Sequence, residues 1–232
     1  MLLEASENHG YAAGNNIGLA WIAAAGDASH VWLLNPDTRA APNALSCMLD
    51  RMAADPSIGV CGALLCEMDQ PDLVQCFGGA GFRRLTARPY DLGKGARASE
   101  PVDRAAVESR LGYVMGACLL ASSAFLDAAG PMDERFFLYF EEIAWQRAAG
   151  PRFRPGFAPE AVVYHRRHAS GGRNEHYLFA NRLRFARWYQ PLCVPPVMLG
   201  LLGTAAAALL RGDRQRVRLL LSPGFWRFGL FG

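Results

Sequence analysis

The sequence predicts an α/β fold, in which the strands of a sheet are connected by helices. Residues 30–35 and 58–65 are compact apolar runs, which are typical of strands buried in a parallel sheet. Residues 42–54 between them carry apolar side chains at helical spacing. Because a strand, a helix and a second strand follow one another, we expect crossover helices packed on the faces of this sheet.

The composition indicates a globular protein with a substantial core. The chain has 232 residues, 51% of them hydrophobic, which suffices for one large domain or one domain with an appendage. A net charge of only +3 argues against nucleic acid as a partner. The six cysteines form no C-x-x-C pair, so we expect buried thiols in a reducing cytosol. The first residues show no secretory signal, which favours a cytoplasmic protein.

Four elements are predicted in the first part of the chain. Residues 17–25 have helical spacing of apolar side chains and stop at a glycine, which predicts a short helix. The strand at 30–35 ends in the turn Pro36-Asp37, so a carboxylate follows its C-terminal end. The helix at 42–54 has proline in its first turn, where the missing N–H costs nothing. The run at 58–65 is the second core strand.

The chain continues with a looser region. Residues 69–109 are rich in Gly, Pro and Arg, which predicts short strands or loops that cover the sheet and face the substrate. A third buried strand is expected at 113–120, followed by a helix at 122–129 that ends at a glycine. An aromatic run then leads to Glu141-Glu142, where a helix should begin because negative charge favours a helix N-terminus. Residues 161–165 predict a short strand that ends in a histidine.

The C-terminal segment is unlike the rest of the chain. Residues 191–210 carry no charge, which is close to the ~20 apolar positions of a membrane-spanning helix, although two adjacent prolines weaken that interpretation. Arg214, Arg216 and Arg218 follow in a basic amphipathic stretch, which favours a helix lying in the membrane interface. An ordinary helix hairpin packed on the domain explains the same pattern equally well.

Several polar side chains are suited to chemistry, and each also has an ordinary structural explanation. Asp37 lies at the sheet edge where α/β proteins bind ligands, although a lone Asp in such a turn more often caps the backbone. Glu141 and Glu142 follow an apolar run, so desolvation would raise a carboxyl pKa toward that of a general base. Charge complementarity at a helix N-terminus explains this pair equally well. His165 is either a satisfied loop residue or a metal ligand.

Six motifs follow one another in a fixed order along the chain: Asn8-His9-Gly10-Tyr11-Ala12-Ala13-Gly14-Asn15-Asn16, Leu34-Asn35-Pro36-Asp37-Thr38, Gly116-Ala117-Cys118-Leu119-Leu120, Gly130-Pro131-Met132-Asp133-Glu134-Arg135-Phe136-Phe137, Tyr139-Phe140-Glu141-Glu142 and Pro159-Glu160-Ala161-Val162-Val163-Tyr164-His165. As an ordered set over residues 7–190 they resemble glycosyltransferase family 2, and within it the rhamnosyltransferase-like branch that builds bacterial surface polysaccharides. The resemblance implies a GT-A fold, a nucleotide-binding α/β sandwich, for residues 1–190. Residues 191–232 are then expected to be a C-terminal helical extension, for which membrane association and packing on the domain are both open.

The resemblance also implies roles for individual residues. Asp37 takes the place of the last carboxylate of a D-x-D-type motif and would hold Mg²⁺ or Mn²⁺ against the donor diphosphate, with His165 completing the metal shell. Glu142 falls at the position of the catalytic base, and Glu141 would orient it or the acceptor. A loop beside the nucleotide is matched by Asn8, Gly10, Gly14 and Asn15. Trp145 and Arg147 would line the acceptor site or merely pack and face solvent.

The sequence departs from the family pattern at its start. Strands that supply nucleobase and ribose contacts in relatives have no counterpart, so the fold is expected to be truncated at its N-terminal side. A mis-started gene product, a chain that needs a partner and a degenerate relative are three interpretations. Ala144 also stands where many relatives have a second acidic residue. We expect exposed apolar strand edges, poor solubility, and weak or no activity.

The function implied is that of an inverting, metal-dependent glycosyltransferase. It would move a sugar from a nucleotide-diphospho-sugar to a cell-surface saccharide or a lipid-linked acceptor, at the inner face of the cytoplasmic membrane. One alternative is a non-catalytic remnant that acts as a scaffold. Another is a small membrane-interface protein that acts through its C-terminal helices.

Overall fold

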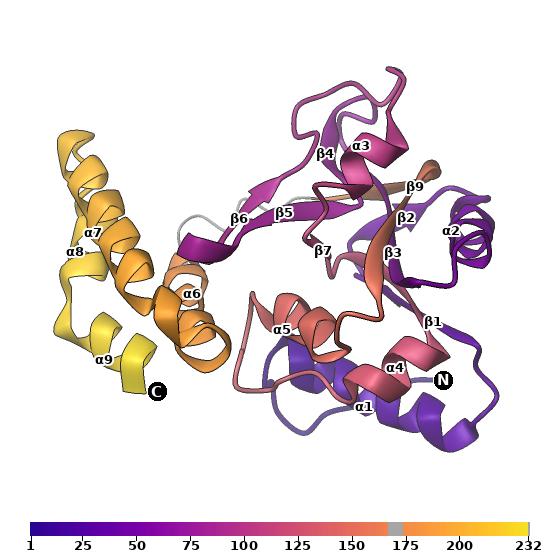
Figure 1. Cartoon of the computed structure of the whole chain (residues 1–232), viewed down its shortest axis with the longest axis horizontal. Helices are drawn as coiled ribbons and strands as arrows, with labels where there is room; N and C mark the ends of the chain where they lie inside the picture. The colour runs from indigo at the N-terminus through magenta and orange to yellow at the C-terminus, as the bar shows by residue number, and fades with distance from the viewer. Residues whose placement is uncertain (167–173, 232) are drawn as a thin grey trace.

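The computed structural model describes residues 1–166 and 174–231, and its centre is a mixed sheet with the strand order β1-β8-β3-β9-β2 (Figure 1). A further strand, β4, pairs with β3. The strands of this sheet are β1 (His30–Leu34), β2 (Thr38–Ala40), β3 (Ile58–Glu67), β4 (Val74–Phe77), β8 (Cys118–Ser122) and β9 (Arg154–His165). The longest apolar run forms β3, and nine of its ten residues are buried. The α/β class expected from the sequence is confirmed.

The predicted strand direction is wrong for part of this sheet. β3 and β9 pair in parallel, but β1 pairs with β8 antiparallel, and β8 also pairs with β3 antiparallel. An apolar run shows that a strand is buried and says nothing about the direction of its neighbours, which depends on how the chain returns to the sheet. In the described part of the chain, only β8 pairs with β1, so the other edge of β1 has no partner strand. The expectation of poor solubility stays a prediction.

Helices cover both faces of the sheet, as expected. α2 (Ala44–Ala53) lies on one face, where Met48 and Met52 contact one set of alternate residues of β3 and β9. On the other face lie α1 (Tyr11–Ala25), α4 (Ser123–Ala129) and α5 (Glu141–Ala148), as Figure 1 shows. There Phe125 and Trp145 pack against Val60 and Leu64 of β3. The two cores therefore use opposite sides of the same strand, in agreement with the two-residue repeat of a β-strand.

The looser region forms a second, three-stranded sheet. Its order is β6-β5-β7, with β5 (Gly79–Arg83), β6 (Arg88–Asp91) and β7 (Tyr113–Val114); η1 (Arg84–Thr86) lies at the β5–β6 turn, and α3 (Arg104–Glu108) follows β6. The single strand expected at 113–120 is therefore wrong. It is divided into β7 and β8, which belong to different sheets, by the turn at residues 115–117. A Cβ on Gly116 would lie 2.8 Å from Tyr11 Oη, so this turn requires a glycine.

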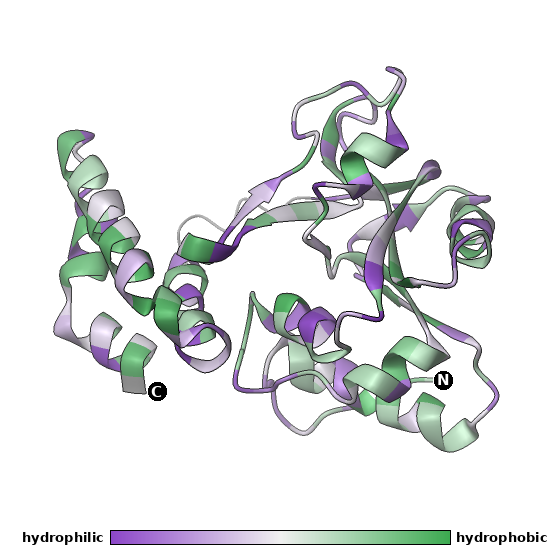
Figure 2. Cartoon of the chain, viewed as in Figure 1, coloured by the Kyte–Doolittle hydropathy of each residue, from purple (hydrophilic) through white to green (hydrophobic). Residues whose placement is uncertain are grey.

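The C-terminal helices form a separate core. They are α6 (Glu175–Tyr189), η2 (Pro191–Cys193), α7 (Val194–Leu210), α8 (Arg214–Leu221) and α9 (Pro223–Phe231). Leu183 and Phe185 of α6 pack with Val197 and Leu201 of α7, and the same cluster includes Phe140 at the start of α5. In Figure 2, α7 is predominantly hydrophobic along its length. α6 lies before the boundary at residue 190 that the sequence suggested, yet its side chains pack with the helices that follow this boundary.

Candidate active site

Asp37 and His165 lie beside each other at one edge of the sheet. Asp37 is in the turn between β1 and β2, where Thr38 Oγ1 donates to Asn35 O at 2.6 Å. β2 pairs with the end of β9, and Thr38 is in register with His165. As a result, His165 Nε2 lies 3.4 Å from Asp37 Oδ1. The Asp37 side chain is 29% exposed and the His165 side chain is 15% exposed, so a ligand can reach both from solvent. The sequence placed both at strand ends, and the sheet brings them into contact.

A buried glutamine fixes the orientation of the imidazole. Gln75, on β4, is 4% exposed, and its Nε2 donates to Glu67 Oε2 at 2.9 Å and to His165 O at 2.7 Å. Its Oε1 therefore faces His165 Nδ1 at 2.9 Å and accepts a hydrogen bond from the Nδ1–H. In the neutral imidazole this leaves the Nε2 lone pair directed toward Asp37. Gln75 was not predicted from the sequence, where its only signal is a polar residue within the apolar run of β4.

The donor set at this edge suits a divalent cation bound together with a substrate. One carboxylate oxygen and one imidazole nitrogen are ligands that Mn²⁺ accepts, and Mg²⁺ or Mn²⁺ commonly takes its remaining ligands from phosphate oxygens and water. Within residues 1–166 and 174–231, no three His, Cys, Asp or Glu side chains gather as a metal site. Glu142 therefore does not join Asp37 and His165 as a third ligand, so the two functions expected for these carboxylates occupy separate places.

Glu141 and Glu142 begin α5, as expected, and the backbone that leads to them is unusual. Tyr139 and Phe140 adopt φ values of 68° and 78°, a left-handed conformation that is uncommon for bulky residues. Asn181 on α6, which is fully buried, donates to Leu138 O at 2.8 Å and to Tyr139 O at 3.1 Å. This amide therefore supports the strained turn that presents the two carboxylates. The only sequence signal for Asn181 is a neutral polar side chain on the buried face of a helix.

The two carboxyl groups are desolvated. Glu141 is 3% exposed, and neither Glu141 Oε2 nor Glu142 Oε2 has a hydrogen-bond partner among the described residues. Burial, and then the nearby charge of Glu142, raise the pKa of Glu141 well above its usual range. Burial also raises the pKa of Glu142, although backbone N–H groups, including that of Gly116, partly oppose the shift. A carboxyl group whose pKa approaches neutrality is suited to general-base catalysis near pH 7.

These raised pKa values predict that the protein becomes less stable as the pH rises. The unfolded chain loses the two protons near pH ~4.3, whereas the folded chain retains them to higher pH, so stability is greatest below pH ~4.3 and is lost as the pH rises through the folded-state pKa. Glu141→Gln removes this penalty. It should raise the melting temperature at pH 8 relative to the wild type, with on the order of 1.4 kcal/mol for each pKa unit removed.

Thermal unfolding at pH 5 and pH 8 measures this effect. The gain from Glu141→Gln should shrink at pH 5, where the wild-type carboxyl is already protonated. Glu160→Gln, on β9, is the matched control, because the Glu160 side chain is exposed and its charge remains solvated in the folded chain. An equal gain at both pH values would mean that the charge of Glu141 does not destabilise the fold.

One turn connects the Asp37 turn to the acidic pair. Asn35 N, at the end of β1, donates to Ala117 O at 3.1 Å. The neighbouring Gly116 provides an N–H near the Glu142 carboxylate, and its carbonyl accepts from Tyr11 Oη at 2.7 Å. The turn at residues 115–117 therefore places the Asp37 turn, the Glu142 carboxylate and the start of α1 around a single backbone segment. Tyr11 was not singled out by the sequence, although it lies within the Asn8–Gly14 motif.

The loop expected beside the nucleotide forms one hollow of about 430 Å³ at the start of α1, which is lined by Asn8, Gly10 and Gly14. Asn8 Oδ1 accepts from Gly10 N at 3.0 Å. Gly10 has φ 96°, and a Cβ there would lie 2.2 Å from Phe137 O, so its glycine is required by packing. Gly14 faces open space. Asn15 Nδ2 donates to Tyr11 O within α1, and Asn15 does not line this hollow.

The two residues considered for the acceptor site differ in position. Trp145 is 1% exposed, packs edge-to-face on Phe125 and donates from Nε1 to Gly130 O at 2.7 Å. The structure therefore favours the packing role that the sequence left open for Trp145. Arg147 is exposed and lines a cavity of about 580 Å³.

All six cysteines are free thiols, and Cys47 and Cys193 are only half-buried, unlike the burial expected for all of them.

Comparisons with known proteins agree with this architecture. No family model matches the chain. N-acetylglucosaminyl-diphospho-decaprenol L-rhamnosyltransferase from two strains of Mycobacterium tuberculosis is 27% identical to this chain over 191 residues, in a match that covers 75% of this chain and 61% of the relative. The crystal structure of GalNAc-T7 with UDP, GalNAc and Mn²⁺ is similar, with a TM-score of 0.56 and 15% identity over 80% of this chain and 36% of that one. The chain thus spans less than two thirds of the length of either relative.

Proposed function

Since the chain is a distant homologue of a rhamnosyltransferase and has the GT-A glycosyltransferase fold, we propose that it carries the catalytic site of an inverting, metal-dependent glycosyltransferase. The donor is a nucleotide-diphospho-sugar, and the acceptor is a lipid-linked or cell-surface saccharide. One observation carries this proposal. The turn at residues 115–117 bonds both to Asn35, in the turn that carries Asp37 and so its neighbour His165, and to the desolvated carboxylate of Glu142.

The chemistry divides between these two places. Asp37 and His165 would hold Mg²⁺ or Mn²⁺, which neutralises the charge that the leaving nucleoside diphosphate gains. Glu142 accepts the proton of the acceptor hydroxyl as its oxygen attacks the anomeric carbon from the face opposite the leaving group. Glu141, whose own pKa burial and the charge of Glu142 hold high, stays protonated near pH 7 and orients Glu142 or the acceptor. The hollow formed by Asn8, Gly10 and Gly14 holds part of the nucleotide.

A transfer assay tests this proposal. The full chain is incubated with Mn²⁺, a series of nucleotide-diphospho-sugars and a polyprenyl-diphosphate-linked N-acetylglucosamine, and the product is analysed by NMR for its anomeric configuration. We expect one donor to react with inversion of configuration. Product that retains the donor configuration would rule out Glu142 as the base of a single displacement, and a chain that binds no nucleotide with or without Mn²⁺ would be the non-catalytic remnant.

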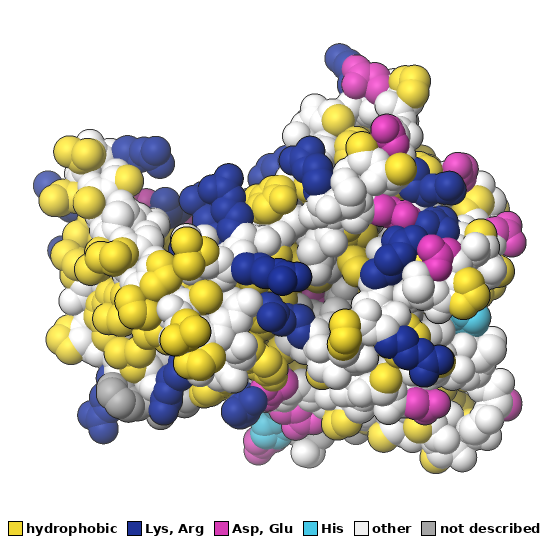
Figure 3. Space-filling view, viewed as in Figure 1, with side chains coloured by type: hydrophobic (Ala, Val, Ile, Leu, Met, Phe, Trp, Pro, Cys, Tyr) yellow, Lys and Arg dark blue, Asp and Glu magenta, His cyan; other side chains and the backbone are white. Residues whose placement is uncertain are grey.

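We further propose that α7 attaches the protein to the inner face of the cytoplasmic membrane. Residues 191–210 are long and apolar enough to cross a bilayer, yet only 22% of the most apolar window is buried in the described structure. Leu199, Leu202 and Leu209 are exposed on the face of α7 opposite to the buried Val197 and Leu201. A helix that is apolar on all sides is normally buried in protein or in lipid. Figure 3 shows hydrophobic side chains gathered over the C-terminal helices on the face in view, with basic side chains nearby.

Membrane attachment predicts a specific defect. Leu199 is 69% exposed, so Leu199→Gln leaves the fold unchanged but removes about 1.5–3 kcal/mol of lipid burial, and vesicle binding should weaken about tenfold or more. Co-sedimentation with vesicles that contain anionic lipid measures this. Leu45→Gln, on α2, is the control, because Leu45 is 40% exposed and lies on the opposite side of the molecule. Equal vesicle binding by the two variants would argue for a helix hairpin that serves only the fold.

A further inference from the structure

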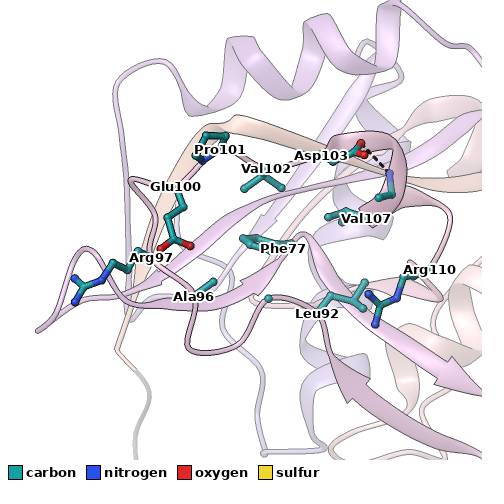
Figure 4. Close-up of a pocket in the computed structure, with 12 residues that line it drawn as sticks. Phe77, Leu92, Ala96, Arg97, Glu100, Pro101, Val102, Asp103, Val107 and Arg110 are labelled. Carbon is teal, nitrogen blue, oxygen red and sulfur yellow. Dashed lines mark hydrogen bonds between the residues drawn. The ribbon is translucent and has the colours of Figure 1, made fainter.

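Three arginines surround a single cavity beside the acidic pair. The cavity has a volume of about 580 Å³ and is lined by Arg84 of η1, Arg110 after α3, Arg147 of α5, and by Phe82, Tyr90 and Gln146. None of its lining residues is Asp or Glu. Arg110 also borders a second cavity, of about 390 Å³, which contains Glu100 and Asp103 (Figure 4). The first cavity therefore differs from the second, because its only charged lining side chains are arginines.

The positive charge of this cavity is not neutralised within the described structure. No carboxylate in residues 1–166 or 174–231 forms an ion pair with Arg84, Arg110 or Arg147. Gln190, in the amide orientation that satisfies both of its ends, donates to Arg84 O at 3.0 Å and accepts from Arg147 Nη1 at 2.6 Å. Burial and the charge of Arg84 lower the pKa of Arg147. Like charges held together by a neutral amide favour the binding of an anion.

The position of the cavity relates it to the proposed reaction. Ile143, Gln146 and Arg147 follow Glu142 on α5, and five residues of α-helix span about 7.5 Å along its axis. Gln146 fixes this part of α5, because it both accepts from Val114 N and donates to Val114 O at 2.8 Å. On the other side, η1, which carries Arg84, contacts α7. The cavity is therefore lined by elements that neighbour both the proposed catalytic base and the exposed apolar helix.

We propose that this cavity binds the diphosphate of a lipid-linked acceptor. Arg84, Arg110 and Arg147 contact the phosphate oxygens, the polyprenyl chain extends along α7, and the sugar attached to the diphosphate reaches toward Glu142. A guanidinium group can donate two parallel N–H bonds to two phosphate oxygens, which fixes the orientation of the phosphate as well as neutralising its charge. Figure 3 shows Lys and Arg side chains in a row between the apolar C-terminal helices and the rest of the molecule, as an amphiphilic ligand of this kind requires. The inference rests on the proposed function for the direction of the sugar.

Calorimetric titration of the full chain with farnesyl diphosphate tests this assignment without any need for turnover. Arg84→Gln, Arg110→Gln and Arg147→Gln should each weaken binding about tenfold or more, because each removes a charge-assisted contact with phosphate. Arg227→Gln, on α9, removes the same charge elsewhere and should leave the affinity unchanged. Wild-type affinity in all three cavity variants would overturn the proposal.

A second arm distinguishes the acceptor diphosphate from that of the donor. UDP binding in the presence of Mn²⁺ should be the same in the wild type and in the three cavity variants, and UDP should not displace farnesyl diphosphate. If the variants lose UDP binding as well, or if UDP competes, the cavity belongs to the donor and the proposal is wrong. If transfer depends on Glu142 while the cavity variants keep their affinity for farnesyl diphosphate, the proposed function stands and this inference fails. If no sugar is transferred but farnesyl diphosphate binding needs the arginines, this inference stands and the proposed function fails.

Discussion

Glu142→Gln should reduce kcat by about 10²–10⁴-fold, the range typical of losing a general base. The amide has nearly the shape of the carboxylate but cannot accept the proton of the acceptor hydroxyl. Because the side chain lies apart from Asp37 and His165, the affinity for a nucleotide with Mn²⁺ should not change. A rate assay at saturating donor and acceptor measures kcat. In the wild type the rate should rise with pH up to the raised pKa of Glu142, since only the ionised group acts as a base.

The neighbouring carboxylate provides the matched comparison. Glu141→Gln makes the same change one residue away, at a carboxyl group whose pKa burial and the charge of Glu142 hold well above its usual range. We expect a smaller loss of kcat than for Glu142→Gln. If Glu141→Gln were the more damaging variant, the two roles would be exchanged. If both variants kept the wild-type rate, the desolvated pair would serve only the N-terminus of α5.

Much of the fold could be predicted from the sequence because strong local signals mark its elements. The apolar run of β3 and the periodicity of α2 each have one good structural explanation, and Gly26 ends α1 in the left-handed conformation that only glycine adopts easily. The start of α5 at Glu141 could likewise be predicted, because two adjacent carboxylates favour a helix N-terminus. Asp37 and His165 were found for a similar reason, since each directly follows or ends a strand and strand ends gather at one edge.

Other features depend on contacts between distant residues and leave no local signal. The division of residues 113–120 between two sheets requires Gly116 to pass close to Tyr11, 105 residues away. The orientation of His165 depends on Gln75, and the left-handed turn before Glu141 depends on Asn181. Each of these polar groups reads as a neutral interruption of an apolar pattern. The antiparallel pairing of β1 and β8 is hidden in the same way, because burial alone sets the composition of both strands.

The arginine cavity shows the same limit for binding sites. Arg84, Arg110 and Arg147 lie in three different elements, and each reads alone as an exposed charge. Only the fold of the β5–β6 hairpin onto α5 and α7 brings them together. Arg147 was considered for the acceptor site because it follows the acidic pair on the same helix, and the cavity supplies a further physical reason for that prediction. By the same standard, the fold places Trp145 in the core.

The second large effect is expected at the sheet edge. Asp37→Asn replaces a charged ligand with a neutral one beside the His165 imidazole, 3.4 Å away. Loss of a residue that merely supports a metal ligand typically costs 10–100-fold in metal affinity, so loss of the ligand itself should cost about 100-fold or more. UDP affinity measured with and without Mn²⁺ reports this directly. In the wild type Mn²⁺ should tighten UDP binding, and in Asp37→Asn this dependence should disappear.

Two companion variants show whether this effect belongs to the metal. Asp50→Asn, on the exposed side of α2, makes the same chemical change away from the sheet edge and should keep the Mn²⁺ dependence. His165→Gln should weaken the dependence as Asp37→Asn does, because both side chains are proposed to hold one ion. If UDP binding tightened with Mn²⁺ equally in Asp37→Asn and in the wild type, Asp37 would be a turn residue that stabilises the link between β1 and β2. The catalytic proposal would then have lost its metal, and Glu142 would be left as a base without a group that stabilises the departing diphosphate.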